Sequence, residues 1–203
     1  MEPRQHWQAV YEAKRPEEVS WYQPVPEPSL EALDRLRIGP EASLIDVGGG
    51  ASALAGELAA RGWRDVTVLD IAASAIDVAR NEIGEVGGSV RWIEADILAW
   101  RPDRTYDVWH DRALFHFLNE TADRAQYVDA LRKGTHGGSV AIIAAFALDG
   151  PQQCSGLPVR RYDAQTMADA LGEDFSLIEA WRQAHVTPWG APQSFQWGAF
   201  SRR

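Results

Sequence analysis

The fold is decided by Ser43-Leu44-Ile45-Asp46-Val47-Gly48-Gly49-Gly50-Ala51-Ser52, an apolar run that leads into three glycines. A helix-forming segment follows from Ala53. Glycines let the backbone turn tightly and approach a ligand closely, because a Cβ atom would occupy the space that the ligand needs. The N-terminus of the following helix adds free N–H donors. The stretch therefore predicts a nucleotide-binding turn, although it also fits the dinucleotide pattern G-x-G-x-x-A.

A carboxylate at the end of the next predicted strand strengthens this interpretation. Residues 65–70 are apolar and β-branched, and they end on Asp70. This acid follows the glycines by about 20 residues, the distance at which a β-α-β unit brings a carboxylate to ribose hydroxyls. The alternative is a solvated acid at a strand end. The next helix is expected to begin near Ser74, whose spacing to Asp77 resembles a capping box.

Predicted strands and helices alternate along the chain, which indicates an α/β fold with a Rossmann-like core. Strands are expected at 43–47, 65–70, 89–94, 106–110, 138–148, 175–184 and 194–201. Helices are expected at 6–14, 29–36, 53–61, 74–83, 121–133 and 164–171, with a loop at 149–163. The pattern predicts a single domain, residues 1–203, with 1–28 as an N-terminal lid segment and 29–203 as the core.

Composition limits the class of partner. The 29 acidic and 20 basic residues give a net charge of −9, and no basic run offers a footprint for nucleic acid. The single cysteine forms no intramolecular disulfide, and the polar start of the chain lacks the apolar core of a signal peptide. The longest apolar stretch, Val140 to Leu148, is too short to span a bilayer. We expect a cytoplasmic protein with no membrane partner, and the sequence leaves its oligomeric state open.

These motifs resemble the class I S-adenosylmethionine-dependent methyltransferases. Asp46-Val47-Gly48-Gly49-Gly50 is similar to their first motif, Asp70 to their ribose-binding acid, and Asp96-Ile97 to their adenine-binding pair. An acid two residues before the first glycine separates this family from nicotinamide-binding folds. The resemblance implies a seven-stranded mixed sheet with an antiparallel last strand and helices on both faces. It implies S-adenosyl-L-methionine as cofactor, held by Trp21, Asp46, Gly48, Gly49, Gly50, Asp70, Ile71, Asp96 and Ile97.

A narrower resemblance concerns two segments outside the core motifs. His6-Trp7, Glu18 to Gln23 and Cys154 to Pro158 are similar to small bacterial members related to eukaryotic citrate synthase and elongation factor lysine methyltransferases. Within the first segment, the rings of Trp21 and Tyr22 suit covering an apolar ligand surface, or burying the hinge of the segment itself. Trp7 and Tyr11 share one helical face, which predicts packing against the body of the protein.

Methyl transfer is an in-line displacement, so positioning of the reactants can supply up to ~7–11 kcal/mol of the barrier. Candidates must lie at the carboxyl ends of the strands, where open α/β sheets bind ligands. His110 is a candidate base, or it shapes the cofactor pocket. Asp111 is expected to attract a cationic amine or to pair with Arg112. The spacing of His110, Asp111 and His116 matches no specific ligand pattern, so no metal site is predicted.

The remaining candidates are expected to contact the acceptor. Cys154 is interpreted as a packing or substrate-contact thiol rather than a nucleophile, because direct transfer needs none. Arg161 and Tyr162 are expected to contact an anionic acceptor or to cap the loop. Aromatic rings in the last connection line a substrate or simply pack there. The predicted substrate residues are Arg112, His116, Cys154, Arg161, Tyr162, His185 and Trp189.

The function predicted from these residues is methyl transfer from S-adenosylmethionine to a small-molecule nucleophile at oxygen, sulfur or nitrogen. The chain has no accessory region for gripping a protein, which favours a small acceptor. Protein-lysine methylation is the alternative that the narrower resemblance favours. A cofactor-binding protein without catalysis and, more remotely, a nicotinamide-dependent dehydrogenase are the other hypotheses.

Overall fold

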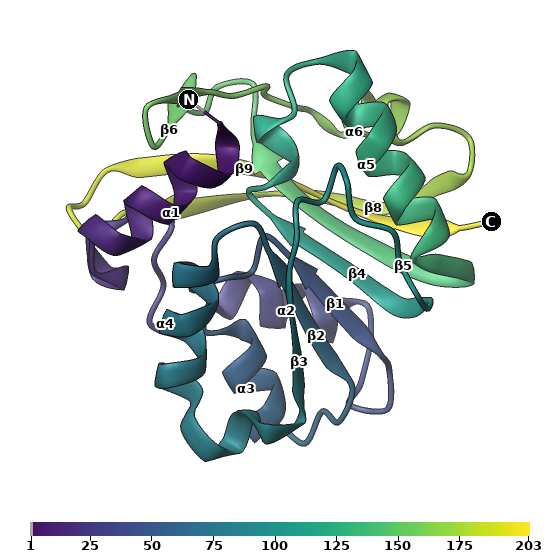
Figure 1. The fold of residues 1–203 in the computed structure, drawn as a ribbon. Helices are drawn as coiled ribbons and strands as arrows, with labels where there is room; N and C mark the ends of the chain where they lie inside the picture. Colours follow the sequence, from purple (N-terminus) through teal and green to yellow (C-terminus); the bar gives the residue numbers. More distant parts are fainter. Residues whose placement is uncertain (1) are drawn as a thin grey trace.

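The structure, a computed structural model, describes residues 2–203 and contains a seven-stranded sheet with the order β3-β2-β1-β4-β5-β9-β8 (Figure 1). Its strands are β1 Leu44–Val47, β2 Val66–Asp70, β3 Val90–Glu94, β4 Tyr106–Arg112, β5 Thr135–Phe146, β8 Phe175–Val186 and β9 Pro192–Arg202. The α-helices are α1 Pro3–Ala13, α2 Glu27–Arg35, α3 Leu54–Ala60, α4 Ala73–Ile83, α5 Thr121–Lys133 and α6 Ala164–Leu171. Every predicted strand and helix is present, with ends shifted by a few residues.

The direction of the last strand confirms the predicted mixed sheet. Strands β1 to β5 pair in parallel, whereas β9 lies antiparallel between β5 and β8. A tight turn joins β8 directly to β9, which requires an antiparallel pair because a parallel connection needs a crossover. The six other strands therefore share one direction, and their carboxyl ends meet at the same edge of the sheet.

Helices cover both faces of the sheet (Figure 1), and one apolar cluster lies on each face. On one face, α5 and α6 pack against alternate residues of β1 and β5 such as Ile45 and Ile143. On the other, α2 and α3 pack against the residues between them, such as Leu44 and Ile142. Side chains of a strand alternate between faces, so both helical layers pack against the same strands. On β4, the same alternation places Trp109 on the face of α5 and α6 and Val108 on the face of α2 and α3.

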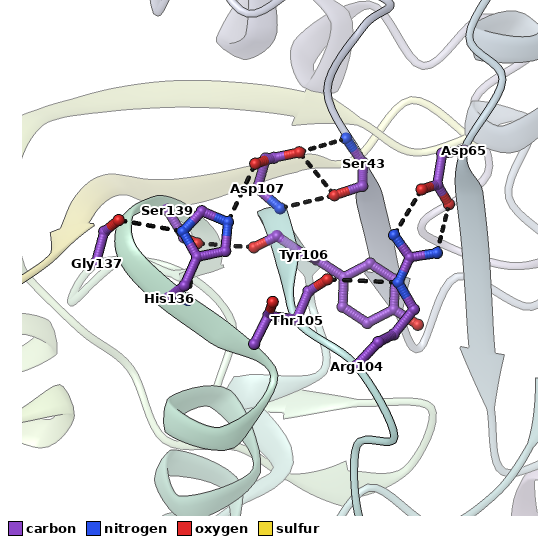
Figure 2. A network of polar contacts seen from close by, with 9 residues as sticks. All are labelled: Ser43, Asp65, Arg104, Thr105, Tyr106, Asp107, His136, Gly137 and Ser139. Carbon is purple, nitrogen blue, oxygen red and sulfur yellow. Dashed lines mark hydrogen bonds and ion pairs between the residues drawn. The ribbon is translucent and has the colours of Figure 1, made fainter.

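Polar side chains hold together the amino ends of β1, β4 and β5, as Figure 2 shows. Ser43 donates its N–H and its hydroxyl to Asp107 Oδ2 at 2.8 and 2.7 Å, and Asp107 N–H donates back to Ser43 Oγ at 3.0 Å. His136 Nε2 lies 3.1 Å from Asp107 Oδ1, and Ser139 Oγ donates to the carbonyl of Tyr106 at 2.8 Å. This edge is closed by pairing within the chain, so a ligand site belongs at the opposite, carboxyl edge.

Two local features differ from prediction. No side chain caps α4: its preceding residue Ala72 donates its N–H to Asp70 Oδ1 at 2.8 Å, so the capping box expected at Ser74 is wrong. The predicted loop 149–163 contains a small hairpin, β6 Gln153–Cys154 and β7 Leu157–Pro158.

Three short 3-10 helices lie at Pro16–Glu18, Gly84–Ser89 and Phe115–Phe117. None of the helices in residues 2–203 combines the length and apolar character needed to cross a bilayer.

Candidate active site

The turn after β1 is packed too closely for side chains at its glycines. Gly48 has a φ of +71°, and a Cβ there would lie 2.7 Å from Leu114 Cδ1. At Gly50 a Cβ would lie 2.5 Å from Ala75 Cβ and 2.6 Å from Asp70 Oδ2. The backbone of this turn therefore approaches both the end of β2 and the loop after β4, which any larger residue would push apart.

Asp70, at the end of β2, is tied to the glycine turn. Gly50 N–H donates to its Oδ2 at 3.0 Å, and Ala72 N–H donates to its Oδ1 at 2.8 Å. Burial raises the pKa of the Asp70 carboxyl to about 6, against the opposing effect of these two hydrogen bonds. Each carboxylate oxygen keeps a further lone pair, so Asp70 can still accept hydrogen bonds from two hydroxyls.

A cavity of about 360 Å³ opens beside Asp70, and we call it the large cavity. Residues after β2 and β3 form one side of it, including the predicted cofactor residues Asp70, Ile71, Asp96 and Ile97. Asp96 Oδ1 accepts the N–H of Leu98 at 2.9 Å, which fixes the carboxylate at the start of its loop. The structure thus gathers the acids that end or follow two neighbouring strands around one apolar space.

Four aromatic rings form the cover of the large cavity. The ring centres of Trp7 and Trp21 lie 5.7 Å apart, those of Trp7 and Phe117 5.0 Å, and those of Tyr11 and Trp21 6.2 Å. All four residues border the cavity. The helical face of Trp7 and Tyr11 does pack against the body, as predicted, and that part of the body is a cavity wall.

Helix α1, which carries the rings of Trp7 and Tyr11 in this cover, is weakly held elsewhere. It has no buried residues among those described. Besides the aromatic contacts, the side chain of Gln8 accepts the N–H of Ser74 at 3.2 Å, and Arg4 pairs with Glu94. Exposed ion pairs of this kind add little stability. A helix with few buried contacts is free to open at low cost, which suits the lid expected for residues 1–28.

His110 lies in a second, small cavity on the α2 side of the sheet. Its Nδ1 is 2.6 Å from Asp46 Oδ1 and its Nε2 is 3.0 Å from Ser29 Oγ, and all three side chains are buried. Gly48, Gly49 and Trp21 border the same cavity. Both ring nitrogens have partners, which favours the pocket-shaping role; that His110 acts as a base stays a prediction.

Asp111 faces the other side of the sheet. It is fully buried, and Tyr127 donates its hydroxyl to Asp111 Oδ2 at 2.7 Å, while Trp109 Nε1 donates to the Tyr127 oxygen at 3.0 Å. Leu114 N–H donates to Asp111 Oδ1 at 2.9 Å, as does the next amide at 3.2 Å. Burial raises the pKa of Asp111 to about 6. Asp111 thus holds the backbone of Leu114, whose side chain lies beside Gly48, and its contact with a cationic amine stays a prediction.

Two of the predicted acceptor residues, Arg112 and Cys154, border the large cavity. Cys154 lies in the β6–β7 hairpin that closes the cavity beside α1 (Figure 1). Burial raises the pKa of its thiol to about 11, so at neutral pH the group is a protonated, apolar wall residue.

The other predicted acceptor residues border neither of these two cavities. Arg161 donates to the carbonyl of Gly150 at 3.2 Å, and Trp189 is 61% exposed in the β8–β9 turn. His185, in β8, donates its Nε2–H to the carbonyl of Ser20 at 2.6 Å, which connects β8 to the N-terminal segment.

His116 and Tyr162 lie in the core. The His116 ring lies 4.5 and 4.6 Å from the rings of Phe117 and Phe146, and burial lowers its pKa to about 3. Tyr162 stacks on Phe115 at 5.2 Å. Their predicted contacts with an acceptor stay predictions, because their side chains reach the site only through other residues.

Sequence reasoning missed several wall residues, among them Leu114, Phe117 and Pro158. The signal for Leu114 was its place directly after the end of β4, at the edge where ligands bind. Among residues 2–203, no group of three or more histidine, cysteine or acidic side chains is arranged to hold a metal ion.

Comparison with known proteins adds a sequence match over this site. Residues 44–138, from β1 into the start of β5, match a family model described as a methyltransferase domain. The matched segment includes the glycine turn, Asp70, Asp96 and the end of β4. No curated protein matches the chain.

Solved structures resemble the fold along nearly the whole chain. One, described for the conversion of a disulfide bond into a thioacetal group during echinomycin biosynthesis, is 23% identical with a TM-score of 0.80, covering 98% of this chain and 92% of its own. A SAM-dependent methyltransferase from Anabaena variabilis is 16% identical with a TM-score of 0.79, covering 100% and 96%. The N-methyltransferase NodS from Bradyrhizobium japonicum, in complex with S-adenosylhomocysteine, is 16% identical with a TM-score of 0.72, covering 99% and 99%. At these identities the likeness confirms the predicted fold.

Proposed function

We propose that the chain is an S-adenosylmethionine-dependent methyltransferase whose acceptor is a small molecule bound in the large cavity; the match of residues 44–138 to a methyltransferase domain supports the activity. One observation carries this proposal. The expected cofactor residues that end or follow β2 and β3 line the same cavity as the aromatic cover, Arg112 and Cys154. Such a space can bring two ligands together.

The cofactor side follows from the donors and acceptors present. Asp70 would accept hydrogen bonds from the ribose hydroxyls, and the adenine ring would pack between Ile71 and Ile97 with Asp96 near its amino group. The small cavity, with Asp46, Gly48 and Gly49, would hold the amino-acid end. A helix N-terminus and a turn without side chains suit this close approach.

The chemistry requires alignment more than proton transfer. S-adenosylmethionine supplies the methyl group on a positively charged sulfur, from which a lone pair of the acceptor displaces it in line. The aromatic cover orients the acceptor and excludes water, which limits hydrolysis. We assign no base, because His110 is engaged at both ring nitrogens; an acceptor with a free lone pair attacks the methyl group first, and its proton leaves when the product reaches solvent.

The descriptions of two structural neighbours support a small acceptor. NodS is described as an N-methyltransferase, and the echinomycin protein is described for chemistry at sulfur. Nitrogen and sulfur are both within the acceptor atoms expected here. The narrower relation to lysine methyltransferases remains the alternative, with a protein side chain entering the same space.

The test is incubation of the purified protein with methyl-labelled S-adenosylmethionine and host extract, followed by separation into protein and small-molecule fractions. Label in small molecules, dependent on Asp70, supports the proposal and yields the acceptor. Label in protein would favour lysine methylation, and label in neither fraction would favour a binding protein without catalysis. Equal labelling by Asp70→Ala would refute the cofactor site.

A further inference from the structure

Arg112 lies between the two cavities with few partners of its own. It is the last residue of β4 and points to the same face as His110, because side chains alternate along a strand. It borders both cavities. Its Nη1 donates to the carbonyl of Trp21 at 3.2 Å, and its guanidinium carbon lies 5.3 Å from the centre of the Phe195 ring.

The described residues do not neutralise this guanidinium. Its Nη2 is buried and has no hydrogen-bond partner among the side chains that the structure describes, and none of the carboxylates described there lies within ion-pair distance of it. Asp46 acts on it from further away, but that carboxylate is bound to His110 at 2.6 Å. The Cys154 thiol is protonated at neutral pH.

The side chain is half-buried, and its Nη2 is buried without a partner, an arrangement that costs free energy until a ligand pairs with it. Burial lowers the pKa of Arg112 to about 10, so the side chain still carries its charge at neutral pH. A guanidinium has five N–H donors in a planar fork that matches a carboxylate. The group is therefore equipped to bind an anion.

The sheet order places this charge away from the ribose-binding acid, and Arg112 also borders the small cavity proposed for the cofactor's amino-acid end. Asp70 ends β2, and β1 separates β2 from β4. Arg112 leans in the opposite direction, over Phe195 of β9, with β5 between β4 and β9. Neighbouring strands lie about 4.8 Å apart, so the guanidinium lies beyond β4 from the ribose-binding acid.

We infer that Arg112 binds an anionic group, such as a carboxylate, on the methyl acceptor. The inference rests on the proposed function and narrows its acceptor class to small molecules that carry an acidic group beside an apolar or aromatic part. It also moves the anion contact expected at Arg161 to a residue inside the cavity, because Arg161 faces the carbonyl of Gly150.

The test uses benzoate and its neutral analogue benzamide, which share a ring that suits the aromatic cover. Isothermal titration calorimetry measures both on the full chain saturated with S-adenosylhomocysteine. We expect wild type to bind benzoate about tenfold tighter or more, because charge-assisted hydrogen bonds are the strong ones. Arg112→Met should abolish this preference and leave the affinity for S-adenosylhomocysteine within about threefold.

Two variants serve as controls. Arg112→Lys keeps the charge without the fork and should retain part of the preference, which also covers the case in which Arg112→Met fails to fold. Arg161→Met removes a charge of equal size outside both cavities and should keep the full preference.

Two results would overturn the inference. One is equal binding of benzoate and benzamide by wild type. The other is a loss of more than about tenfold in S-adenosylhomocysteine affinity in Arg112→Met, which would assign the arginine to the cofactor's own carboxylate. If wild type failed to bind S-adenosylhomocysteine, the proposed function would fall, and the benzoate comparison on the free protein would still decide the role of Arg112.

Discussion

Replacing Asp70 with alanine removes the one carboxylate that joins the glycine turn, the start of α4 and the large cavity. In the free protein it leaves two buried N–H groups, those of Gly50 and Ala72, without their acceptors. With cofactor present, the change also removes the acceptor proposed for the ribose hydroxyls. The substitution thus acts on stability and on binding, and the two effects have different sizes.

The stability effects largely cancel. Each N–H left unpaired costs about 1–3 kcal/mol. Against this, the rise of the Asp70 pKa from 3.8 to about 6 already includes these two hydrogen bonds, so at neutral pH burial of the ionised group costs the folded state at least about 3 kcal/mol, which alanine relieves. We expect a small net change in the free energy of unfolding. Binding has no such compensation, because two hydrogen bonds to a charged group are worth about 3–6 kcal/mol, or a loss of roughly 10²- to 10⁴-fold in affinity.

The assay is calorimetric titration of S-adenosylmethionine at a temperature where circular dichroism shows both proteins folded. Asp77→Ala is the matched control, since it removes an exposed acid from the next helix. It should bind the cofactor like wild type. An affinity of Asp70→Ala within about threefold of wild type would show that the carboxylate does not receive the ribose.

Two further predictions concern the same turn. The pKa of Asp70 in the free protein is about 6, so the carboxyl gains a proton as the pH falls through that value. Below it, the affinity for S-adenosylmethionine should weaken by up to about tenfold per pH unit. Calorimetry from pH 8 to 5 should find this slope in wild type and not in Asp70→Ala. Gly48→Ala should cost about 1–3 kcal/mol of stability through its φ of +71° and should displace Leu114 from the cavity wall, so that cofactor binding is lost. Gly172→Ala, with a φ of +80° and open space around it, should lose stability in thermal unfolding but keep binding; equal binding by both variants would contradict the role of Leu114.

The sequence was sufficient for the fold because its local signals agree with one another. Strand and helix patterns alternate regularly, and the glycines and the acid of Asp70 lie where a β-α-β unit needs them. The site residues after β2 and β3 were predictable for the same reason, since the carboxyl ends of parallel strands lie at the same edge of the sheet. The hairpin β6–β7 was not, because two-residue strands depend on contacts with α1 and the cavity rather than on their own pattern.

The acceptor side was harder to predict because it depends on which way side chains point. His110, Asp111 and Arg112 read as one cluster, but alternation along β4 places Asp111 alone against α5. His116 and Tyr162 follow in sequence and look available, whereas the short 3-10 helix and the loop turn both into the core. Trp7 and Tyr11 differ from prediction in the other direction: their helical spacing is typical of core packing, but both border the large cavity.

The division of β4 between two faces has a consequence for how such a protein can diversify. On one face, Asp111 with Tyr127 and Trp109 holds the loop after β4. On the other face, Arg112 borders the large cavity. Changes on opposite faces share no hydrogen-bond partner, and substitutions without shared partners tend to combine additively. Under the proposed function, the acceptor range can therefore be altered at Arg112 and the aromatic cover, one position at a time, without changing the hydrogen bonds of Asp111.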